Sequence, residues 1–471
     1  MKIIKLARAF YLERIFMDIK DVLDKQDQFF KSNITLDYAF RKRQLINLKQ
    51  IIKKYENEIL LALNNDLNKS STEAYMCEVG IVFNEINYYL KNLKKFMKQK
   101  KVKTPLTAFP STSFIKPSPR GRVLIISPWN YPFLLTFQPL IGAISAGNVV
   151  IIKPSEHSIN TSLIIEKICN EVFDEGHVKV MIGNKDISSE LLNHRFDYIF
   201  FTGGSKVGKI VYKSASEFLT PVTLELGGKS PCIIDDNCDL NMTAKKIVFG
   251  KFLNAGQTCV APDYVLLPLK KKEQFISLLK FWVNKMYLDG LNNKDYPRII
   301  NEFHFNRLIS LIDKEKVILG GGYDRNTNKI EPTILDDISL QDEIMKEEIF
   351  GPILPLIYYK EKREIDEVLN HYSSPLACYI FSKDKKFISY YLETYNFGGG
   401  CINDTIMHLL NHNLPFGGVK NSGIGSYHGQ ETFKIFSHYK SIIKKHAFID
   451  VNLRYPPYQK KKEKIIKKVL K

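Results

Sequence analysis

The sequence predicts an α/β protein in which a doubly wound nucleotide-binding domain precedes a second α/β domain, with a small oligomerisation arm. Two observations carry this prediction. First, short apolar β-rich runs (VLIIS, NVVII, VKVMI, YIFF and VTLEL) recur between residues 120 and 226, and helical stretches at 162–173 and 205–218 separate them. Nearly continuous apolar strands that alternate with helices indicate a parallel sheet covered on both faces. Second, a further α/β pattern follows from 227 to about 400.

Length and composition limit the possible classes of protein. The chain has 471 residues, 44% of them apolar and 25% charged, which suits about three lobes and excludes a mostly disordered chain. The longest apolar candidate, 140–152, is interrupted by Ser145 and Asn148, so we expect no membrane-spanning helix. The first residues lack the apolar stretch of a secretory signal. Seven scattered cysteines without a CxxC pair argue against disulfides and a zinc-ribbon site, so we expect no metal and a cytoplasmic location.

The first part of the chain is predicted to be helical. Residues 1–16 are an N-terminal extension, and 17–100 form the helical part of the cofactor domain. Apolar residues recur there at helical spacing, at Leu45, Leu48, Ile51 and Ile52. The segment 101–119 contains four prolines. It is predicted to be an extended connector or an edge hairpin, and to serve as the oligomerisation arm, because proline makes a poor central strand.

Four more segments complete the domain prediction. The dinucleotide-binding domain covers 120–226, and the catalytic domain, with a candidate nucleophilic cysteine, covers 227–402. Residues 403–459 are predicted to return to the first domain and to make dimer contacts. Residues 460–471 form a Lys-rich tail.

The net charge of +18 is concentrated in three segments. Residues 1–16, 91–103 and 460–471 together hold 16 of these charges, so the rest of the chain is nearly neutral. A nucleic-acid-binding protein more often carries its basic residues on one surface of a folded domain, among aromatic residues that stack on bases. We therefore expect no nucleic acid partner. Solvated Lys-rich ends are the ordinary interpretation, and contact with an anionic surface is the alternative.

The motif TGGSKVGK at 202–209 follows a predicted strand and opens a predicted helix. Its glycines permit a tight turn, and the helix N-terminus would offer free N–H groups to a phosphate. A P-loop is one interpretation, but Ile210 stands where its magnesium-binding hydroxyl is required. A dinucleotide loop is the other, although GxGxxG is absent. An ordinary strand-to-helix turn remains open.

Three residues have the surroundings of catalytic groups. Cys259, in LNAGQTCVAPD, lies in irregular backbone that suits a nucleophilic thiol, although most loop cysteines are not catalytic. Glu225 ends a predicted strand between two leucines, where desolvation would raise its pKa toward that of a general base. A solvent-facing edge glutamate is the alternative. Asn130, in SPWNYP, suits an oxyanion-stabilising donor or, alternatively, a turn cap.

Taken together, the motifs resemble one family. PWNYP, KPSE, FTGGSKVG, LELGGK, GQTC, EEIFGP and PFGGVKNSGIG occur in the order and spacing of the aldehyde dehydrogenase superfamily. The resemblance covers residues 17–457. Three further segments, KQKKVKTPL, APDYVL and RYPPYQKKK, resemble the class 3 branch, which includes fatty aldehyde dehydrogenases.

The resemblance implies a role for each matching residue. Cys259 corresponds to the nucleophile, Asn130 with the Cys259 backbone N–H to the oxyanion hole, and Glu225 to the base that hydrolyses the thioester. Several residues correspond to cofactor-binding positions, namely Trp129, Lys153, Glu156, Gly203, Ser205, Gly208, Leu226, Glu348 and Phe350. Asn403 resembles a family asparagine near the active site. No metal is implied.

The resemblance also implies a reaction and an assembly. The cofactor is NAD or NADP, and the reaction oxidises aliphatic, medium- to long-chain or aromatic aldehydes to acids. Acylating relatives that use coenzyme A usually lack the carboxylate at the Glu225 position. Class 3 members are commonly homodimers. Membrane-bound members carry an apolar C-terminal anchor, whereas KKKEKIIKKVLK is too short and too charged to span a bilayer.

Two other classes of protein remain alternatives on the sequence. One is a P-loop phosphotransferase or ATPase, and the other is a module that binds nucleic acid or a membrane surface through its lysines. The apolar residues of the tail recur at helical spacing opposite lysines, at Ile465, Ile466, Val469 and Leu470. This pattern is typical of a short interfacial helix that contacts an anionic membrane surface weakly, although a disordered solubilising tail is equally simple.

Overall fold

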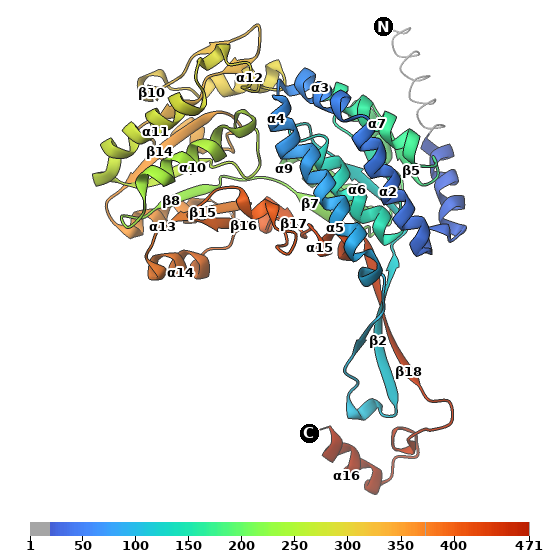
Figure 1. The fold of residues 1–471 in the computed structure, drawn as a ribbon. Coiled ribbons are helices and arrows are strands. Elements are labelled where there is room, and N and C mark those ends of the chain that lie inside the picture. Colours follow the sequence, from blue (N-terminus) through green and yellow to red (C-terminus); the bar gives the residue numbers. More distant parts are fainter. Residues whose placement is uncertain (1–18, 373, 471) are drawn as a thin grey trace, which may run out of the picture.

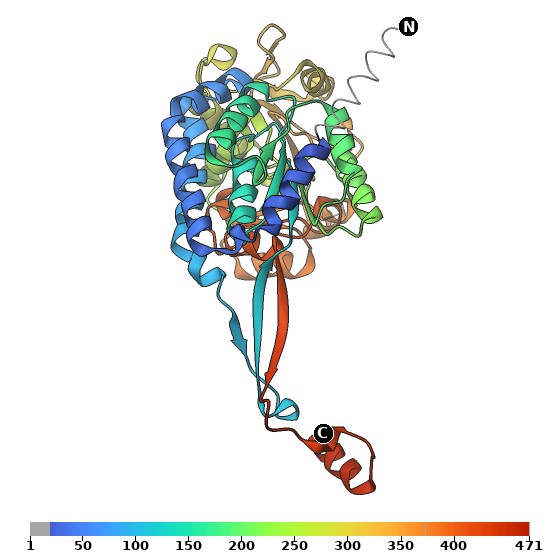
Figure 2. The same cartoon turned by 90° about the vertical axis from the view of Figure 1, so that its right-hand side faces the viewer.

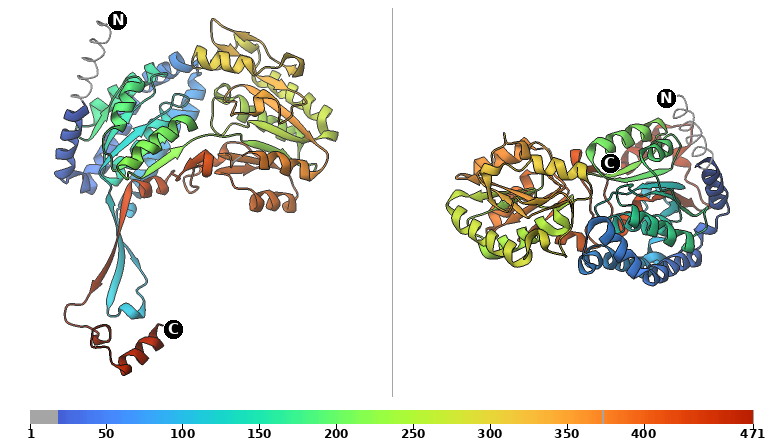
Figure 3. Two further views of the ribbon diagram at one scale, coloured as in Figure 1. Left: turned by 180° about the vertical axis from the view of Figure 1, so that it is seen from behind. Right: turned by 90° about the horizontal axis from the view of Figure 1, so that it is seen from above.

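The computed structural model describes residues 19–372 and 374–470, so the extension predicted at 1–16 lies outside the described part. Two α/β lobes lie side by side, and a long β-ribbon projects from the first lobe (Figures 1 and 3). The α/β fold class predicted from the alternating strands and helices is confirmed.

The first lobe is built on a six-stranded sheet with the order β17-β7-β6-β3-β4-β5. Five parallel strands correspond to the five predicted apolar runs, and the short β17 is antiparallel to β7. Their bounds are β3 Arg122–Ile126, β4 Val149–Lys153, β5 Val178–Val180, β6 Tyr198–Thr202, β7 Val222–Glu225 and β17 Gly423–Ile424. Every residue of β4 and β6 is buried, which explains their unbroken apolar sequences.

Helices cover both faces of this sheet. Side chains of α2, α3, α5, α6 and α7 pack on one face, and those of the helix at 19–31, α8 and α9 pack on the other. Their bounds are α2 Tyr38–Lys54, α3 Glu56–Leu67, α4 Ser71–Ala74, α5 Gly80–Phe96, α6 Leu134–Ala146, α7 Ile159–Val172, α8 Lys185–Leu192, α9 Ser205–Glu217 and α15 Gln430–Ile435. A single π-helical turn, Tyr75–Val79, joins α4 to α5.

The second lobe has a seven-stranded sheet with the order β10-β13-β14-β9-β8-β15-β16. Its strands are β8 Pro231–Ile234, β9 Tyr264–Pro268, β10 Val317–Leu319, β13 Thr333–Leu335, β14 Ile353–Tyr359, β15 Ala377–Phe381 and β16 Gly399–Ile402. A separate hairpin pairs β11 Tyr323–Asp324 with β12 Lys329–Ile330. Helices α10 and α11 pack on one face of the large sheet, and α12, α13 and α14 on the other. They span α10 Leu240–Phe252, α11 Lys272–Met286, α12 Glu302–Ser310, α13 Lys362–His371 and α14 Lys385–Thr394.

Short 3₁₀ turns connect many of these elements. They lie at Ile34–Leu36, Leu106–Ala108, Leu253–Gly256, Leu269–Lys271, Gly290–Asn292, Lys314–Lys316, Glu343–Met345, Met407–Leu410, Lys420–Ser422 and Asn452–Arg454.

The projecting ribbon is a three-stranded antiparallel sheet formed by β1 Lys100–Val102, β2 Ser111–Pro119 and β18 Ser437–Lys445 (Figure 2). The Pro-rich segment, predicted as an extended connector or an edge hairpin, is extended, but β2 is the middle strand of the ribbon, between β1 and β18. Prolines are tolerated there because β1 pairs only with residues 113–115. Pro117 and Pro119 therefore lie where that side of β2 has no partner strand, and their missing N–H groups are not required.

The described part of the tail is the helix α16, Lys460–Val469, at the far end of the ribbon (Figure 1). All its residues are at least partly exposed, including Ile465 and Val469. Among the described residues, no helix has both the length and the apolar character needed to cross a bilayer.

Candidate active site

The predicted site residues gather at the carboxyl ends of four neighbouring strands. Asn130 follows β3, Lys153 ends β4, Ser205 follows β6 and Glu225 ends β7. In a doubly wound sheet the ligand crevice lies at this edge, where the strand order reverses. Here the reversal falls between β3 and β6.

The loop that carries Cys259 has a tightly constrained backbone. Asn254, Ala255 and Gly256 are three consecutive residues with positive φ, at 53°, 51° and 73°. A Cβ on Gly256 would lie 2.2 Å from the carbonyl oxygen of Gly351, so only glycine permits this approach to the EEIFGP loop. Such strained backbone persists only where its surroundings fix it.

Buried hydrogen bonds supply that fixation. The Gln257 amide donates to the carbonyls of Asn254 (3.1 Å) and Arg298 (3.0 Å) and accepts from the Ile300 N–H (3.1 Å). The next residue, Thr258, shares a 2.7 Å hydrogen bond with the hydroxyl of Tyr131. The half-buried Cys259 thiol is thereby presented from a rigid loop. Burial and the nearby carboxylates of Glu348 and Glu225 raise its pKa to about 12.

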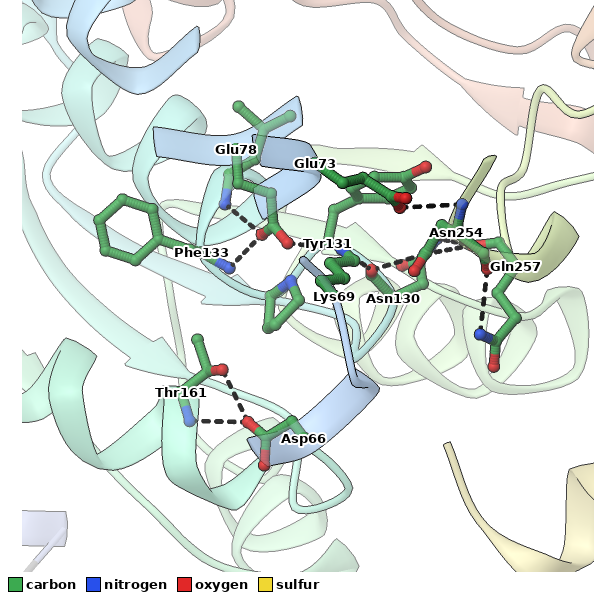
Figure 4. Close-up of polar contacts among 12 residues, drawn as sticks. Asp66, Lys69, Glu73, Glu78, Asn130, Tyr131, Phe133, Thr161, Asn254 and Gln257 are labelled. Atoms are coloured by element: carbon green, nitrogen blue, oxygen red, sulfur yellow. Dashed lines mark hydrogen bonds and ion pairs between the residues drawn. The ribbon is translucent and has the colours of Figure 1, made fainter. Parts of the chain in front are cut away.

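Asn130 is bound to the same loop. Its Nδ2 donates to the Gln257 carbonyl at 3.0 Å, and its own carbonyl accepts from Asn254 Nδ2 at 2.9 Å and from Lys69 Nζ at 2.9 Å (Figure 4). The side-chain amide and the main-chain carbonyl of Asn130 thus both connect the turn after β3 to the loop that carries Cys259. The amide is therefore fixed in one orientation against the loop that carries Cys259.

A buried ion pair supports Asn130 from behind (Figure 4). Lys69 Nζ lies 2.6 Å from Glu78 Oε1, and both side chains are fully buried. Glu78 Oε2 accepts from the N–H groups of Phe133 (2.9 Å) and Leu134 (3.2 Å) at the start of α6. The π-helical turn brings Glu78 to this position, as such turns often do at functional sites.

Sequence reasoning missed this support. Glu73, from the same region, accepts a hydrogen bond from the Asn254 N–H at 3.0 Å. The available signal was that Glu78 stands between apolar residues, Cys77 and Val79, in a helical pattern. A second missed residue is Lys229. It forms a buried pair with Asp263 (2.6 Å) and donates to the carbonyl of Glu347 (3.1 Å), which anchors the EEIFGP loop.

Glu225 is a buried carboxylate without a hydrogen-bonding partner. Its residue is 2% exposed, and no described group forms a hydrogen bond with either side-chain oxygen. Burial therefore raises its pKa well above the usual value. The backbone is fixed on both sides, because Glu225 pairs with Thr202 of β6 and with Gly423 of β17. The solvent-facing alternative for this residue is wrong.

The glycine turn after β6 leaves space for a ligand. A Cβ on Gly204 would meet no atom within 4 Å, so the N-terminus of α9 opens on free space. A Cβ on Gly208 would lie 2.7 Å from Leu226, so this glycine lets α9 pack on the end of β7. Ser205 is the first residue of α9, and the Gly203 N–H donates to the Glu225 carbonyl at 3.0 Å. This open helix N-terminus fits a pyrophosphate.

Two polar groups flank that turn. Lys153 Nζ is buried, donates to the Pro154 carbonyl at 2.7 Å and lies 3.3 Å from Glu156, whose side chain is partly exposed. Burial lowers the pKa of Lys153. On the other side, a Cβ on Gly227 would lie 2.2 Å from Glu348, so the LELGG turn packs directly on this carboxylate. Burial and Asp263 raise the pKa of Glu348 to about 8. Both positions suit hydroxyl groups of a nucleotide.

Aromatic rings complete this side of the crevice. Trp129 and Phe350 meet edge to face, with ring centroids 5.4 Å apart. Their position beside the thiol loop fits a planar ring of a cofactor. The residues present therefore fit a dinucleotide along its length.

Asn403 is placed differently. Its amide donates to the Ser382 carbonyl (2.9 Å) and accepts from the Ser382 N–H (2.9 Å). Both ends of the amide thus join β16 to the end of β15, which gives Asn403 a structural role in the contacts seen here.

The fold and the site define a dinucleotide-binding enzyme. The sequence profile described as the aldehyde dehydrogenase family matches residues 17–442, so the chain belongs to this family. It is 46% identical over 436 residues to the 4,4'-diaponeurosporen-aldehyde dehydrogenase of Staphylococcus aureus, covering 92% of this chain and 95% of that protein. It is 44% identical over 438 residues to aldehyde dehydrogenase family 3 member A2 of Macaca fascicularis, covering 92% and 90%.

A solved structure gives the same result. The substrate-bound state of Staphylococcus aureus AldH superposes with a TM-score of 0.94 at 45% identity, covering 96% of this chain and 99% of that one. The protein is an aldehyde dehydrogenase that oxidises aldehydes to acids with NAD or NADP. The chain is therefore a dehydrogenase, and the phosphotransferase interpretation is wrong.

Proposed function

We propose that Cys259, Asn130 and Glu225 perform the chemistry of this oxidation. The observation that carries the proposal is their convergence: a half-buried thiol on a rigid loop, an amide bound to that loop, and a buried carboxylate without a partner. The Cys259 thiol loses its proton to solvent, the thiolate adds to the aldehyde carbon, and the Asn130 amide with the Cys259 N–H stabilises the resulting oxyanion. Bound NAD or NADP supplies the hydride acceptor.

The second half of the reaction hydrolyses the thioester left on Cys259. Glu225 takes a proton from water, the hydroxide adds to the acyl carbon, and the Cys259 sulfur leaves as thiolate. Burial raises the pKa of Glu225, and a carboxylate of higher proton affinity is a stronger base toward water.

The cofactor-binding roles form part of the same proposal. Lys153 and Glu156 hold the adenosine ribose, Gly203, Ser205 and Gly208 receive the pyrophosphate with Leu226 behind them, and Glu348 binds the nicotinamide ribose beside Trp129 and Phe350. Glu156 disfavours a 2′-phosphate unless it turns away, and its partial exposure permits such a turn. We therefore propose use of both NAD and NADP.

A panel of aldehydes with each cofactor tests the proposal. Aliphatic aldehydes of increasing length and aromatic aldehydes are supplied with NAD or NADP, and the absorbance of the reduced nicotinamide is followed. We expect turnover with apolar aldehydes and formation of the free acid without coenzyme A. Turnover that requires coenzyme A would contradict the role given to Glu225.

We also propose a cytoplasmic homodimer in which the ribbon of each subunit covers the other subunit. The ribbon leaves apolar residues exposed on β18, with Ile442 at 40% and Ile443 at 54%. A relative from Canis lupus familiaris, 42% identical, is described as dimeric. Light scattering should give twice 54.4 kDa at micromolar concentration. A monomer would contradict the proposal, and cell fractionation checks the location.

The tail is proposed to contact anionic lipid weakly. Helix α16 presents Ile465 and Val469 on a strongly basic helix. Each lysine contributes only about 1 kcal/mol near an anionic surface, so binding should be reversible and weaken with salt. Flotation with anionic and neutral vesicles compares the full chain with a chain ending at Gln459. Equal flotation of both chains would mean that the tail does not bind lipid and is only a solvated charged segment.

A further inference from the structure

Three side chains that can ligate a metal ion converge, and none of them belongs to the proposed catalytic or dinucleotide-binding residues. They are Glu85 of α5, His412 in the loop that follows the Met407–Leu410 turn, and His428 just before α15. One ligand atom from each lies within 4.8 Å of the others. Glu85 is fully buried, His428 is 4% exposed, and the His412 side chain is 13% exposed. None of them has a part in the proposed oxidation.

The contact between Glu85 and His412 is close but is not an ordinary hydrogen bond. Glu85 Oε2 lies 2.9 Å from His412 Nε2. Yet within the described residues neither atom has a hydrogen bond of acceptable geometry, and Glu85 Oε1 has none either. A buried carboxylate left this way is costly. The two groups are thus in contact without satisfying each other's hydrogen-bonding capacity.

The His428 ring is oriented as metal-binding imidazoles usually are. Its Nδ1 lies 3.2 Å from the Leu414 carbonyl oxygen, which can only accept, so Nδ1 carries the proton. With the proton on Nδ1, Nε2 is the ring nitrogen that can bind a metal ion, as in sites where a second hydrogen bond fixes the tautomer of the ligand. The backbone holds the ring there at φ 94°, and the His428 N–H donates to Thr432 Oγ1 at 2.7 Å. Such strain in a residue other than glycine is typical of functional positions.

Space for further ligands lies beside the cluster. A cavity of about 100 Å³ is bordered by His412, His428, Tyr88 and Glu431, among others. This volume accommodates roughly three water molecules. Tyr88 stacks on the His412 ring at 4.7 Å, and the His428 ring lies nearly parallel at 5.1 Å, so His412 is held between them.

We propose that Glu85, His412 and His428 form a binding site for a divalent transition metal ion, with Zn²⁺ as the best match and water as the fourth ligand. Two imidazole nitrogens and one carboxylate oxygen are the donors that zinc takes in three-ligand sites. With bonds of about 2.1 Å, tetrahedral ligands lie about 3.4 Å apart. On binding, Glu85 Oε2 and His412 Nε2, now 2.9 Å apart, must therefore separate by about 0.5 Å, while the other ligand atoms, which lie within 4.8 Å, draw together. One of the two nearly parallel histidine rings must also turn so that both nitrogens face the ion. The ion would tie the segment 412–428, which contains β17 beside Glu225, to α5.

The test measures metal binding directly, in the full-length Cys259→Ser protein so that the catalytic thiol adds no ligand. After removal of metal with a chelator, Co²⁺ and Zn²⁺ are titrated. Visible absorption reports Co²⁺ geometry, and competition with a chromophoric chelator gives Zn²⁺ affinity. We expect one equivalent, an intense tetrahedral Co²⁺ spectrum and a melting temperature that rises with Zn²⁺. Because this test does not depend on turnover, it stands or fails separately from the proposed reaction.

Variants assign the site. Glu85→Gln and His428→Asn should weaken Zn²⁺ binding by at least about 100-fold, since loss of a supporting group alone costs 10–100-fold. His412→Asn, at the more exposed position, serves if the buried variants fail to fold. His438→Asn changes an exposed histidine on β18 and is the matched control, which should bind like the parent. No saturable binding in the parent, or equal binding in the His412→Asn variant and the control, would overturn the proposal.

Discussion

Removal of the Lys69 ammonium should show how much the support of Asn130 contributes to stability and to activity, without a change to any residue that is given a chemical role. Lys69→Met keeps the aliphatic chain but deletes the ion pair with Glu78 (2.6 Å), the hydrogen bond to the Asn130 carbonyl (2.9 Å) and the contact over the Tyr131 ring (4.1 Å). Both partners of the ion pair are fully buried. The Glu78 carboxylate is then left without its cation in a site that water does not reach.

The magnitude follows from this burial. Removal of one partner of a buried ion pair costs about 3–5 kcal/mol. Glu78 still accepts two backbone N–H groups, so we expect the free energy of unfolding to fall by about 3 kcal/mol. Loss of a complete oxyanion donor costs about 10²–10³ in kcat, and Asn130 keeps its bonds to Asn254 and Gln257. We therefore expect kcat/KM to fall by about 10–100-fold, with little change in cofactor affinity.

Urea unfolding and steady-state kinetics measure both effects, and the double variant Lys69→Met/Glu78→Gln is the control. Glutamine removes the stranded charge, so the double variant should recover about 2 kcal/mol of the lost stability. Its activity should remain low, because the bond to Asn130 is still absent. A single variant within about 0.5 kcal/mol of the parent, or a double variant no more stable than the single one, would refute the reasoning.

Three further predictions concern single side chains. Cys259→Ser should abolish oxidation while fluorescence titration shows near-normal cofactor affinity, because the dinucleotide rests on the strand ends; near-normal turnover would falsify the nucleophile assignment. Glu225→Gln should give a single-turnover burst of reduced nicotinamide and a steady-state rate about 10²–10⁴-fold lower, since a general base contributes that much. An absent burst would mean that Glu225 acts earlier in the reaction. Normal turnover would mean that another group, such as Glu348, is the base. His177 is buried among Phe29, Phe40 and Phe173, and burial lowers its pKa to about 3. Below about pH 6.5 the unfolded chain therefore binds a proton on this histidine that the folded protein does not bind. Stability should therefore fall by about 2 kcal/mol between pH 8 and pH 5, measured by urea unfolding, and His177→Phe should remove that part of the pH dependence; an unchanged dependence would contradict the role of burial.

The parallel sheet of the first lobe was readable from the sequence because its strands are buried on both faces. An unbroken apolar run such as VVII in β4 is then required, and Glu225 at the end of β7 stands out as the exception. The motif residues could likewise be found from the local sequence, because they lie at or just after the ends of these apolar runs. In a parallel sheet the carboxyl ends of the strands lie at one edge, so these residues come together there.

Other features depend on distant partners and had no local signal. Lys69 acquires its role from Glu78 and from Asn130, 61 residues away. Strand β17 has two residues, too few for any periodicity, and exists only because β7 offers a free edge. The central position of β2 depends on β18, which lies more than 300 residues later in the sequence. Tertiary pairing decides such elements, not local propensity.

The pairing of β7 with β17 has a consequence for the order in which the enzyme matures. Glu225 is synthesised about 200 residues before Gly423, the neighbour that completes its edge of the sheet. At about 5–20 residues per second, the ribosome needs roughly 10–40 s to make that distance. During this interval Cys259, the proposed nucleophile, is already added to the nascent chain, but β7, which carries the proposed base Glu225, still has an open side. Catalytic competence therefore arrives late in translation, and a ribosome stalled between the two strands would hold a first lobe that still lacks β17 and α15, together with an unfinished active site.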